Sequence, residues 1–512
     1  MPDWTYQPLR PVAAAVLGEQ RTRRWALRFL ATLVAAGGHR WIPRVFDHPA
    51  VPEEWTGRFG AVVPPSVARD AIRVLPVQGA SIVEISPVTA ADVRTVRDAA
   101  AGRRCHVVAH AESSDVADLV APHVDEVIVG TPPHRRYLTD PDIDTAVAAL
   151  ADSDAVVLAR PSVLLDSGPG WFNRVIEAST PTEEPPGLRS IGPNPVRWPS
   201  WVWGTLAGIG LIVAGVGAGA IAAGPVLLGY DRDYLGLGVD DLRRINANLV
   251  HFIRHDRISM AGNMIGLGAL YVGLSWGGLR RGRVWARNVM LISGLVAFLT
   301  LFYFVGTGFV DPLHTVVVVV LFPMLLAAVW NKPYPPRWRA LPDGPESERR
   351  RALWAQLIII GVGGGLAVAG LVISLVGLSD VFVPTDLQYM HTHGDALRSA
   401  DPQLVPFIAH DRAGFGGALI GSGLAVALIA MWGFRRGERW VWWTLLAGFI
   451  AGTVPALAVH YAIGYTNFIH LLPVYVLVVA TAIALILSRP YLTARQRGPN
   501  WRSPASPRPG TM

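Results

Sequence analysis

Hydrophobic and polar positions follow different patterns in the two parts of this chain. In residues 1–197, short apolar runs alternate with segments of helical periodicity, as in a globular α/β domain. Residues 198–490 instead contain apolar runs of about 20 residues, long enough to cross a hydrocarbon core of about 30 Å as helices. The pattern therefore predicts a soluble domain followed by an all-α polytopic membrane domain.

The first part contains five short runs of β-forming residues, and helical patterns separate them. The predicted strands are 61–63, 81–85, 106–109, 126–129 and 155–158, and the predicted helices include 90–101, 114–121 and 143–151. Strands that alternate with helices predict a parallel sheet. Before them, Arg21, Arg24 and Leu27 belong to an amphipathic helical stretch. This stretch fits either a membrane surface or ordinary packing on its own domain.

The second part contains eight candidate membrane spans. They are predicted at 201–226, 258–277, 285–306, 313–330, 355–378, 413–432, 440–460 and 469–488. Charged residues are absent from most span centres, which argues against an ion-coupled transporter. The glycine-rich stretches 208–219 and 361–365 indicate close helix packing rather than phosphate binding.

The membrane part is an internal duplication with an offset of 155 residues. The sequence FIRHDR at 252–257 recurs as FIAHDR at 407–412, each time just before an apolar run. Other matched pairs are Asp231 and Asp386, Tyr234 and Tyr389, Asp240 and Asp395, Arg243 and Arg398, and, after a one-residue shift, His314 and His470. Each copy holds four spans, so both copies insert in the same direction. We therefore predict two parallel four-helix repeats related by a pseudo-twofold axis along the membrane normal.

Composition and charge exclude some of the functions and sites that this chain could otherwise have. Only 16% of the 512 residues are charged, which is low for a soluble protein, and the mean hydropathy is +0.35. The net charge of +7 comes from arginines, which in the membrane part lie mostly in loops beside helices, so no nucleic-acid partner is predicted. Cys105 is the only cysteine, which excludes a disulfide within the chain and a thiolate metal cluster.

The orientation in the membrane follows from the N-terminus and from the positive-inside rule. The start of the chain lacks the pattern of a signal peptide, so we expect the soluble domain in the cytoplasm. The connections then predicted to be cytoplasmic hold eighteen arginine or lysine residues, and the outer connections hold seven. We predict a plasma-membrane protein with both termini in the cytoplasm and the duplicated polar residues on the outer face.

These duplicated residues are the candidate ligand-binding site. They are Asp231, Tyr234, Arg243, His255, Asp256, Arg257, His314, Asp386, Tyr389, Arg398, His410, Asp411, Arg412 and His470. The first interpretation is purely structural: Asp256 and Asp411 cap their helices while Arg257 and Arg412 reach lipid headgroups. A second interpretation is an outward-facing pocket for an anion or small polar ligand in each copy.

A third interpretation is a divalent metal site. His255, Asp256, Asp311 and His314 offer mixed imidazole and carboxylate ligands suited to zinc or iron, although Asn467 replaces Asp311 in the second copy. Haem would need paired histidines within the spans; the pattern offers none, since His460 lies at a span end.

Residues 4–178 resemble class 2 dihydroorotate dehydrogenase. The motifs YQPLRP, ALRFL, VFDHP, GRFGAVV, GASIVEISPVT, DLVAPHVDEVIVGTPP and LLDSGPG occur in the order found in that family. The resemblance implies a TIM barrel that binds FMN and passes electrons to a quinone. It also implies that Thr131 stands in for the catalytic hydroxyl and that Gly168 and Gly170 belong to the flavin-phosphate region.

The departures from that family predict an incomplete, non-catalytic relative. Val67 stands where the family has its flavin lysine, while Ile128 and Pro133 replace substrate-binding asparagines. About 175 residues with five strand signals are also too few to close a (β/α)₈ barrel, which needs at least about 200. We therefore expect no cofactor, or FMN if the chain is a membrane-tethered, quinone-linked oxidoreductase after all.

Together these observations predict a domain layout and a function. The domains are an α/β domain at 1–179, a proline-rich linker at 180–200, membrane repeats at 201–334 and 355–491 joined by a cytoplasmic linker at 335–354, and a disordered tail at 492–512. The expected function is a non-catalytic membrane protein that binds a small ligand or a protein partner on its outer face. The sequence leaves the identity of the ligand and the oligomeric state open.

Overall fold

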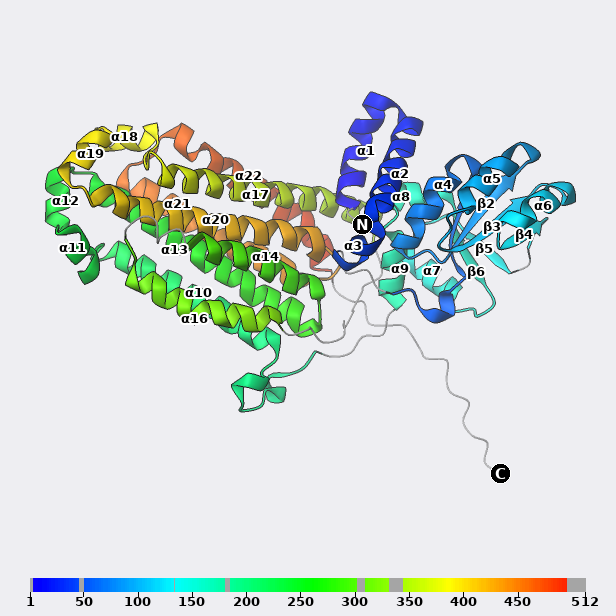
Figure 1. Cartoon of the computed structure of the whole chain (residues 1–512), viewed down its shortest axis with the longest axis horizontal. Helices are drawn as coiled ribbons and strands as arrows, with labels where there is room; N and C mark the ends of the chain where they lie inside the picture. Colours follow the sequence, from blue (N-terminus) through cyan, green and yellow to red (C-terminus); the bar gives the residue numbers. More distant parts are fainter. Residues whose placement is uncertain are drawn as a thin grey trace.

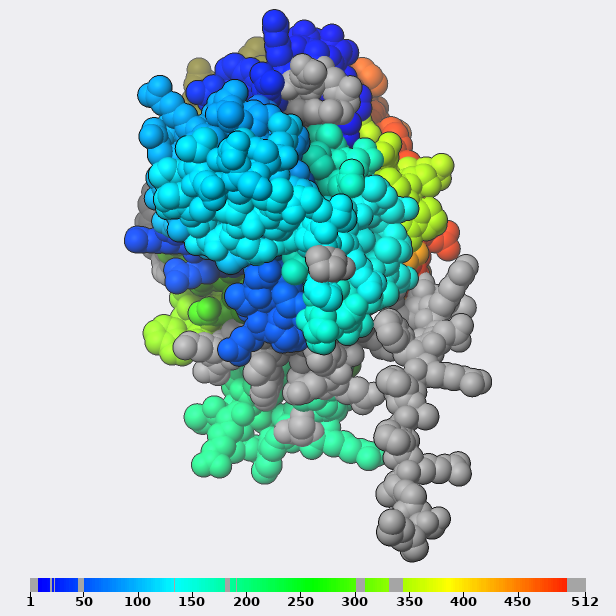
Figure 2. Space-filling view, turned by 90° about the vertical axis from the view of Figure 1, so that its right-hand side faces the viewer, coloured from blue at the N-terminus to red at the C-terminus, as the bar shows by residue number. Residues whose placement is uncertain are grey.

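The computed structural model describes residues 3–45, 50–132, 134–179, 185–301, 309–330 and 344–494. It consists of an α/β domain followed by a bundle of long helices (Figure 1). The α/β domain lies at one end of the bundle, and four short helices cover the opposite end (Figure 1). In Figure 2, which views the molecule from the α/β end, this domain stands in front of the bundle.

The α/β domain begins with three helices and continues as alternating strands and helices. The helices are α1 (Asp3–Leu17), α2 (Glu19–Leu33), α3 (His39–Val45), α4 (Pro65–Val74), α5 (Val93–Ala100), α6 (Ser114–Val120), α7 (Ile143–Leu150), α8 (Pro161–Ser167) and α9 (Trp171–Ser179). The strands are β1 (Phe59–Val63), β2 (Ile82–Val88), β3 (His106–Ala111), β4 (Glu126–Val129), β5 (Arg135–Leu138) and β6 (Val156–Ala159).

The six strands form one parallel sheet in the order β4-β3-β2-β1-β6-β5. The five predicted strands and the predicted parallel sheet are confirmed. Strand β5, with the sequence RRYL, was not predicted because it lacks a β-type apolar run. The sheet curls into a half-barrel, and an ion pair of 2.6 Å between Arg135 of β5 and Glu126 of β4 links its two edge strands.

Each face of this sheet packs against side chains of the domain itself. Phe59, Trp171 and Phe172 are fully buried in the core between the sheet and its covering helices. On the inner face, Ile82, Val108, Ile128 and Leu158 form a second, smaller core. Burial of these large side chains stabilises the half-barrel by roughly 1.5–3 kcal/mol each.

The bundle is built from long apolar helices and four short polar ones. The long helices are α10 (Ser200–Ala223), α13 (Leu249–Gly273), α14 (Val284–Leu301), α16 (Pro312–Trp330), α17 (Glu346–Leu378), α20 (Leu404–Gly433), α21 (Arg439–Ile463) and α22 (Phe468–Leu492). The short helices, here called the cap helices, are α11 (Gly229–Leu235), α12 (Val239–Ile245), α18 (Pro384–Met390) and α19 (Gly394–Ala400).

Seven helices in the part of the chain that the structure describes are long and apolar enough to cross a membrane. The exception among the predicted spans is 285–306, where α14 is a shorter apolar helix and residues 302–308 lie outside the described part. The predicted helical part is therefore confirmed, and its seven candidate spans are compatible with a multi-pass membrane protein.

The duplication is visible in the way the helices pack. A side-chain carbon at Gly208 of α10 would lie 2.8 Å from the backbone of α13, and one at Gly363 of α17 would lie 2.6 Å from the backbone of α20. These glycines are 155 residues apart and make the same contact in the two copies. Close packing at the glycine-rich stretches, as predicted, is confirmed for these two positions.

Three helices begin earlier than the apolar runs indicated. The first residues of α13 and α20 are Leu249 and Leu404, nine residues before the predicted span starts at 258 and 413. Helix α17 begins at Glu346, inside the predicted 335–354 linker. The His-Asp-Arg stretches were expected at the starts of their helices. This is wrong, because His255 lies about 9 Å along the helix axis from the first residue of α13.

The α/β domain contacts the bundle through polar groups. Arg435, which follows α20, pairs with Glu177 of α9 at 3.1 Å. Arg349 of α17 donates to the carbonyl oxygen of Asp166 at 3.3 Å, and Arg280, which follows α13, donates to the carbonyl oxygen of Pro186 at 2.7 Å. Arginines from the predicted cytoplasmic connections thus hold the domain against this end of the bundle.

Candidate metal centres

The cap helices cover two clusters of polar residues buried in the bundle. One contains His255, His460 and His470, and the other contains Asp311, His314 and His410. In each cluster the ligand atoms lie within 4.8 Å of one another. Each cluster combines residues of both repeats, because the histidine of one His-Asp-Arg stretch meets side chains from the other copy.

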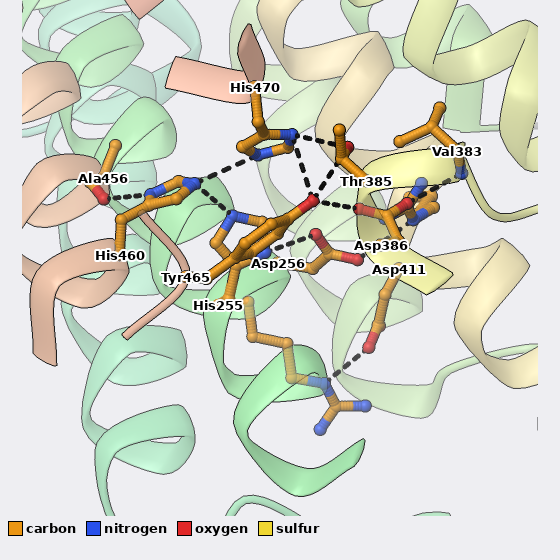
Figure 3. Close-up of polar contacts among 12 residues, drawn as sticks. His255, Asp256, Val383, Thr385, Asp386, Asp411, Ala456, His460, Tyr465 and His470 are labelled. Atoms are coloured by element: carbon orange, nitrogen blue, oxygen red, sulfur yellow. Dashed lines mark hydrogen bonds and ion pairs between the residues drawn. The ribbon is translucent and has the colours of Figure 1, made fainter. Parts of the chain in front are cut away.

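In the first cluster, three imidazole rings from α13, α21 and α22 point toward one another (Figure 3). The Nε2 atom of His460 lies 2.9 Å from Nε2 of His255 and 3.2 Å from Nε2 of His470. His255 and His460 are 5% and 4% exposed, so water does not separate the rings.

The opposite nitrogen of each ring faces an oxygen atom. Nδ1 of His460 lies 2.6 Å from the carbonyl oxygen of Ala456, and Nδ1 of His255 lies 3.0 Å from a carboxylate oxygen of Asp256. Nδ1 of His470 lies 3.2 Å from the hydroxyl of Tyr465. That hydroxyl donates to Asp386 at 2.7 Å, and the hydroxyl of Thr385 also lies near Nδ1 of His470, at 3.4 Å (Figure 3). A proton on Nδ1 of each ring would leave three Nε2 lone pairs converging.

Converging lone pairs repel one another unless a proton or a metal cation lies between them. Three nitrogens bound to zinc at about 2.0–2.1 Å in a tetrahedral site lie about 3.3 Å apart. The observed separations of 2.9 and 3.2 Å come close to that value. A ring whose Nδ1 donates to carboxylate, carbonyl or hydroxyl oxygen is also the usual arrangement of a metal-binding histidine. The cluster therefore fits a divalent transition metal with an open fourth position.

The second cluster has two histidines and a carboxylate. Nδ1 of His314 lies 3.1 Å from Nε2 of His410 and 3.4 Å from Oδ2 of Asp311. The other oxygen of Asp311 accepts the N–H groups of Leu313 and His314 and the hydroxyl of Tyr230. These bonds fix the carboxylate at the start of α16 with Oδ2 turned toward the two rings. Mixed nitrogen and oxygen ligands suit zinc or iron.

Two buried arginines connect the clusters across the repeats. Arg257 lies between Asp231 of its own copy and Asp411 of the other, at 3.0 and 2.8 Å. Arg412 lies between Asp386 of its own copy and Asp256 of the other, at 2.7 and 3.3 Å. The reciprocal contacts agree with the predicted twofold relation between the copies.

Carboxylates outnumber cationic side chains in this network. The carboxylates are Asp231, Asp256, Asp311, Asp386 and Asp411, and the guanidinium groups are Arg257 and Arg412. Four of these carboxylates contact a guanidinium group, and with all five ionised the seven side chains carry a net charge of −3. A buried excess of negative charge is costly, and bound cations offset it.

Burial shifts the pKa values of the polar groups that the cap and the connecting loops contribute. Burial raises the pKa of Tyr465, and the nearby Asp386 raises it further, so the hydroxyl keeps its proton near neutral pH. Burial also raises the pKa of Asp231, although Arg257 acts in the opposite direction. For Asp311, the effect of burial is outweighed by His314 and His410, which hold its pKa below the ordinary value.

The structure brings together only some of the predicted ligand residues. Tyr234 packs against Phe309, Tyr389 stacks on Tyr465, and each thus lies beside a cluster rather than in it. Arg243 and Arg398 are exposed and pair with their own helix neighbours Asp240 and Asp395. The four residues of the predicted metal site divide between the clusters: His255 and Asp256 lie in the first, and Asp311 and His314 in the second.

The interpretation of capping residues and lipid-facing arginines is wrong. The residues that precede α13 and α20 are Asn248 and Gln403, whereas Asp256 and Asp411 lie inside the helices and bind arginine. Arg257 is only 8% exposed and lies between two carboxylates. The arginines and carboxylates pair with one another across the repeats. The arginines therefore need neither water nor lipid headgroups as partners.

Sequence reasoning missed two residues of the first cluster. His460 and Tyr465 have no counterpart of the same type, because Phe304 and Phe309 stand 156 positions earlier. A search for matched pairs therefore passes over them. Their spacing from His470 by ten and five residues across a short turn is the only signal that the sequence carries.

In the described part of the α/β domain, the residues that the resemblance assigns to a flavin site do not form one. The inner face of the half-barrel is filled by its own core and by Glu84, which is fully buried and bonded to Arg135 and Tyr137. Thr131 is exposed after β4, and Gly168 and Gly170 form the turn between α8 and α9. The residues present do not fit FMN, and we derive no reaction step through it.

No protein-family model, curated protein or solved structure matches this chain. The class of protein is therefore defined by the fold and the two clusters alone.

Proposed function

We propose that this protein is a multi-pass membrane metalloprotein that binds two divalent transition-metal ions beneath its cap helices. The convergence of three Nε2 lone pairs from His255, His460 and His470 carries the proposal. The uncompensated carboxylate charge around the clusters supports it. The small ligand expected on the outer face is thus a metal ion, with an open coordination position for a further ligand.

The proposal includes the orientation inferred from the arginines. We place the cap helices outside the plasma membrane, the α/β domain and both termini in the cytoplasm, and eight spans in two repeats between them. The separation of the cap and the α/β domain at opposite ends of the bundle supports this orientation. A fluorescent protein fused after residue 494 should fluoresce in cells, whereas activity of a periplasmic reporter enzyme at that position would contradict it.

We also propose that the α/β domain is a shortened relative of dihydroorotate dehydrogenase without flavin chemistry. The parallel half-barrel and its filled inner face support this relation. The purified protein should be colourless at flavin wavelengths, and a flavin spectrum would refute the non-catalytic assignment.

Metal analysis of the purified protein tests the main proposal. We expect about two transition-metal ions per chain in the wild type, since two clusters each hold three ligands. His460→Ala and His410→Ala should each lose one of them. His393→Ala is the matched control, because this exposed histidine lies on the cap away from both clusters. Wild-type protein without bound metal, or equal loss in the control, would overturn the proposal.

A further inference from the structure

An apolar cavity lies beside the second cluster, between α10, α13, α14, α16 and α20. It is partly open to the surroundings, so its roughly 600 Å³ of atom-free space includes space outside the protein. The lining residues are Leu211, Met260, Met264, Leu267, Tyr271, Ala297, Phe298, His314, Val317, Gly414 and Ala418. His314 belongs both to this wall and to the second cluster, so the cavity ends at a candidate metal ligand.

The lining favours a hydrocarbon over water. Apart from His314, its only side-chain hydroxyl belongs to Tyr271, and this group already bonds Ser293 at 3.1 Å. A buried water needs two to four polar partners, whereas apolar cavities bind hydrocarbons. From Met260 to Tyr271 the cavity follows α13 for about 16 Å, which gives it the shape of a channel for a chain.

The cavity-lining positions of α20 differ from the matching positions of α13. Gly414 and Ala418 follow His410 by one and two turns on α20 and line the cavity. The matching residues on α13 are Ser259 and Asn263, which are buried and polar. Small residues beneath His410 leave space where the other copy has side chains. The lining beneath His410 therefore differs from the matching part of the other copy.

The charge around His314 limits the polar end of the occupant. Asp311 lies 3.4 Å from His314, and Asp231 and Asp411 share the single guanidinium of Arg257. Without a bound metal ion, an anionic headgroup beside His314 would meet the carboxylate of Asp311 at low dielectric. A neutral oxygen group avoids this repulsion and can coordinate a metal ion.

We propose that the cavity binds the chain of a neutral single-chain lipid, such as a long-chain alcohol or aldehyde. The chain lies along α13 between Met260 and Tyr271, and the oxygen group lies beside His314 at the second cluster. The headgroup contact rests on the proposed metal site, whereas the chain contact rests on the cavity alone. The protein would thus bring a membrane-dissolved substrate to a metal ion from within the bilayer.

Photolabelling in lipid vesicles tests the inference. The probe is hexadecanol with a diazirine on its chain, and mass spectrometry locates the labelled residues. We expect labels on Met260, Met264 and Val317, and stronger competition from hexadecanol than from hexadecanoate. Val317→Phe should lower this labelling about tenfold by displacing roughly two methylene groups of the chain. Val319→Phe is the matched control, because Val319 lies on the same helix and is 65% exposed.

The outcomes separate this inference from the proposed function. Undiminished cavity labelling in Val317→Phe, or labels only on exposed helix faces, overturns the inference whatever the metal content. Cavity labelling in a protein that binds no metal supports the chain site and refutes the metal proposal. Equal competition by hexadecanoate overturns the neutral headgroup.

Discussion

Replacing Tyr465 with phenylalanine removes one hydroxyl that serves two neighbours. This hydroxyl donates to the carboxylate of Asp386 at 2.7 Å and accepts from Nδ1 of His470 at 3.2 Å. Without it, Nδ1 of His470 keeps only the more distant hydroxyl of Thr385, at 3.4 Å, of these two oxygen neighbours. The ring can then carry its proton on Nε2, where it competes with the metal ion.

The size of the effect follows from these two bonds. Loss of a partner that orients a metal-binding histidine lowers metal affinity about 10–100-fold. Loss of a hydrogen bond to a buried carboxylate costs about 1.5–3 kcal/mol of stability. At about 2–4 °C per kcal/mol for a domain of this size, we expect Tm to fall by roughly 3–12 °C.

The assay is competition for metal between the purified protein and a chromophoric chelator, with Tm measured in the same detergent. Tyr461→Phe is the control, because Tyr461 lies near the end of α21, four residues before Tyr465, and its hydroxyl bonds Tyr475 at an exposed position. Affinity within twofold of wild type in Tyr465→Phe would refute the reasoning. An equal loss in Tyr461→Phe would do the same.

Three further substitutions or reactions test the packing and charge described above. Arg412→Met should destabilise the protein by about 3–5 kcal/mol, since it leaves two carboxylates buried without their cation; Arg398→Met, an exposed control, should leave Tm unchanged. Gly423→Leu should cost about 1–3 kcal/mol, because its side chain would meet the backbone of α17 at 2.5 Å, whereas Gly361→Leu points into open space. Burial, with a contribution from nearby acidic charge, raises the pKa of Cys105 to about 12, so maleimide at pH 7.5 should react slowly with the folded protein and quickly after unfolding. Fast labelling of the folded protein would contradict this burial.

The helices and strands were largely predictable because they depend on local patterns. The alternation of apolar runs and helical segments located β1, β2, β3, β4 and β6, and the long apolar runs located the bundle helices. Strand β5 was not found, since its arginines pair with Glu84, Glu126 and Asp152 only after the sheet has formed. Long-range pairing of this kind leaves no periodic signal in the sequence.

The candidate site was predictable in its composition but not in its arrangement. The duplication singled out His255, His410, His314 and His470, and these lie in the two clusters. From the duplication we expected each copy to build its own outward-facing site. In the described structure, each cluster instead combines buried residues of both copies. His460 could not be found in this way, because a residue present in only one copy is invisible to a comparison of the two.

The exchange of residues between copies has a consequence for the origin of the chain. A single unit with one His-Asp-Arg stretch holds no complete cluster, since His255 needs His470 and His410 needs His314. An ancestor with one copy would therefore have worked only as a symmetric pair with two equal sites. After fusion of the two units, the two sites could change independently. One site could acquire His460 while the other kept the carboxylate of Asp311. The described structure thus holds two different clusters, each built from residues of both halves.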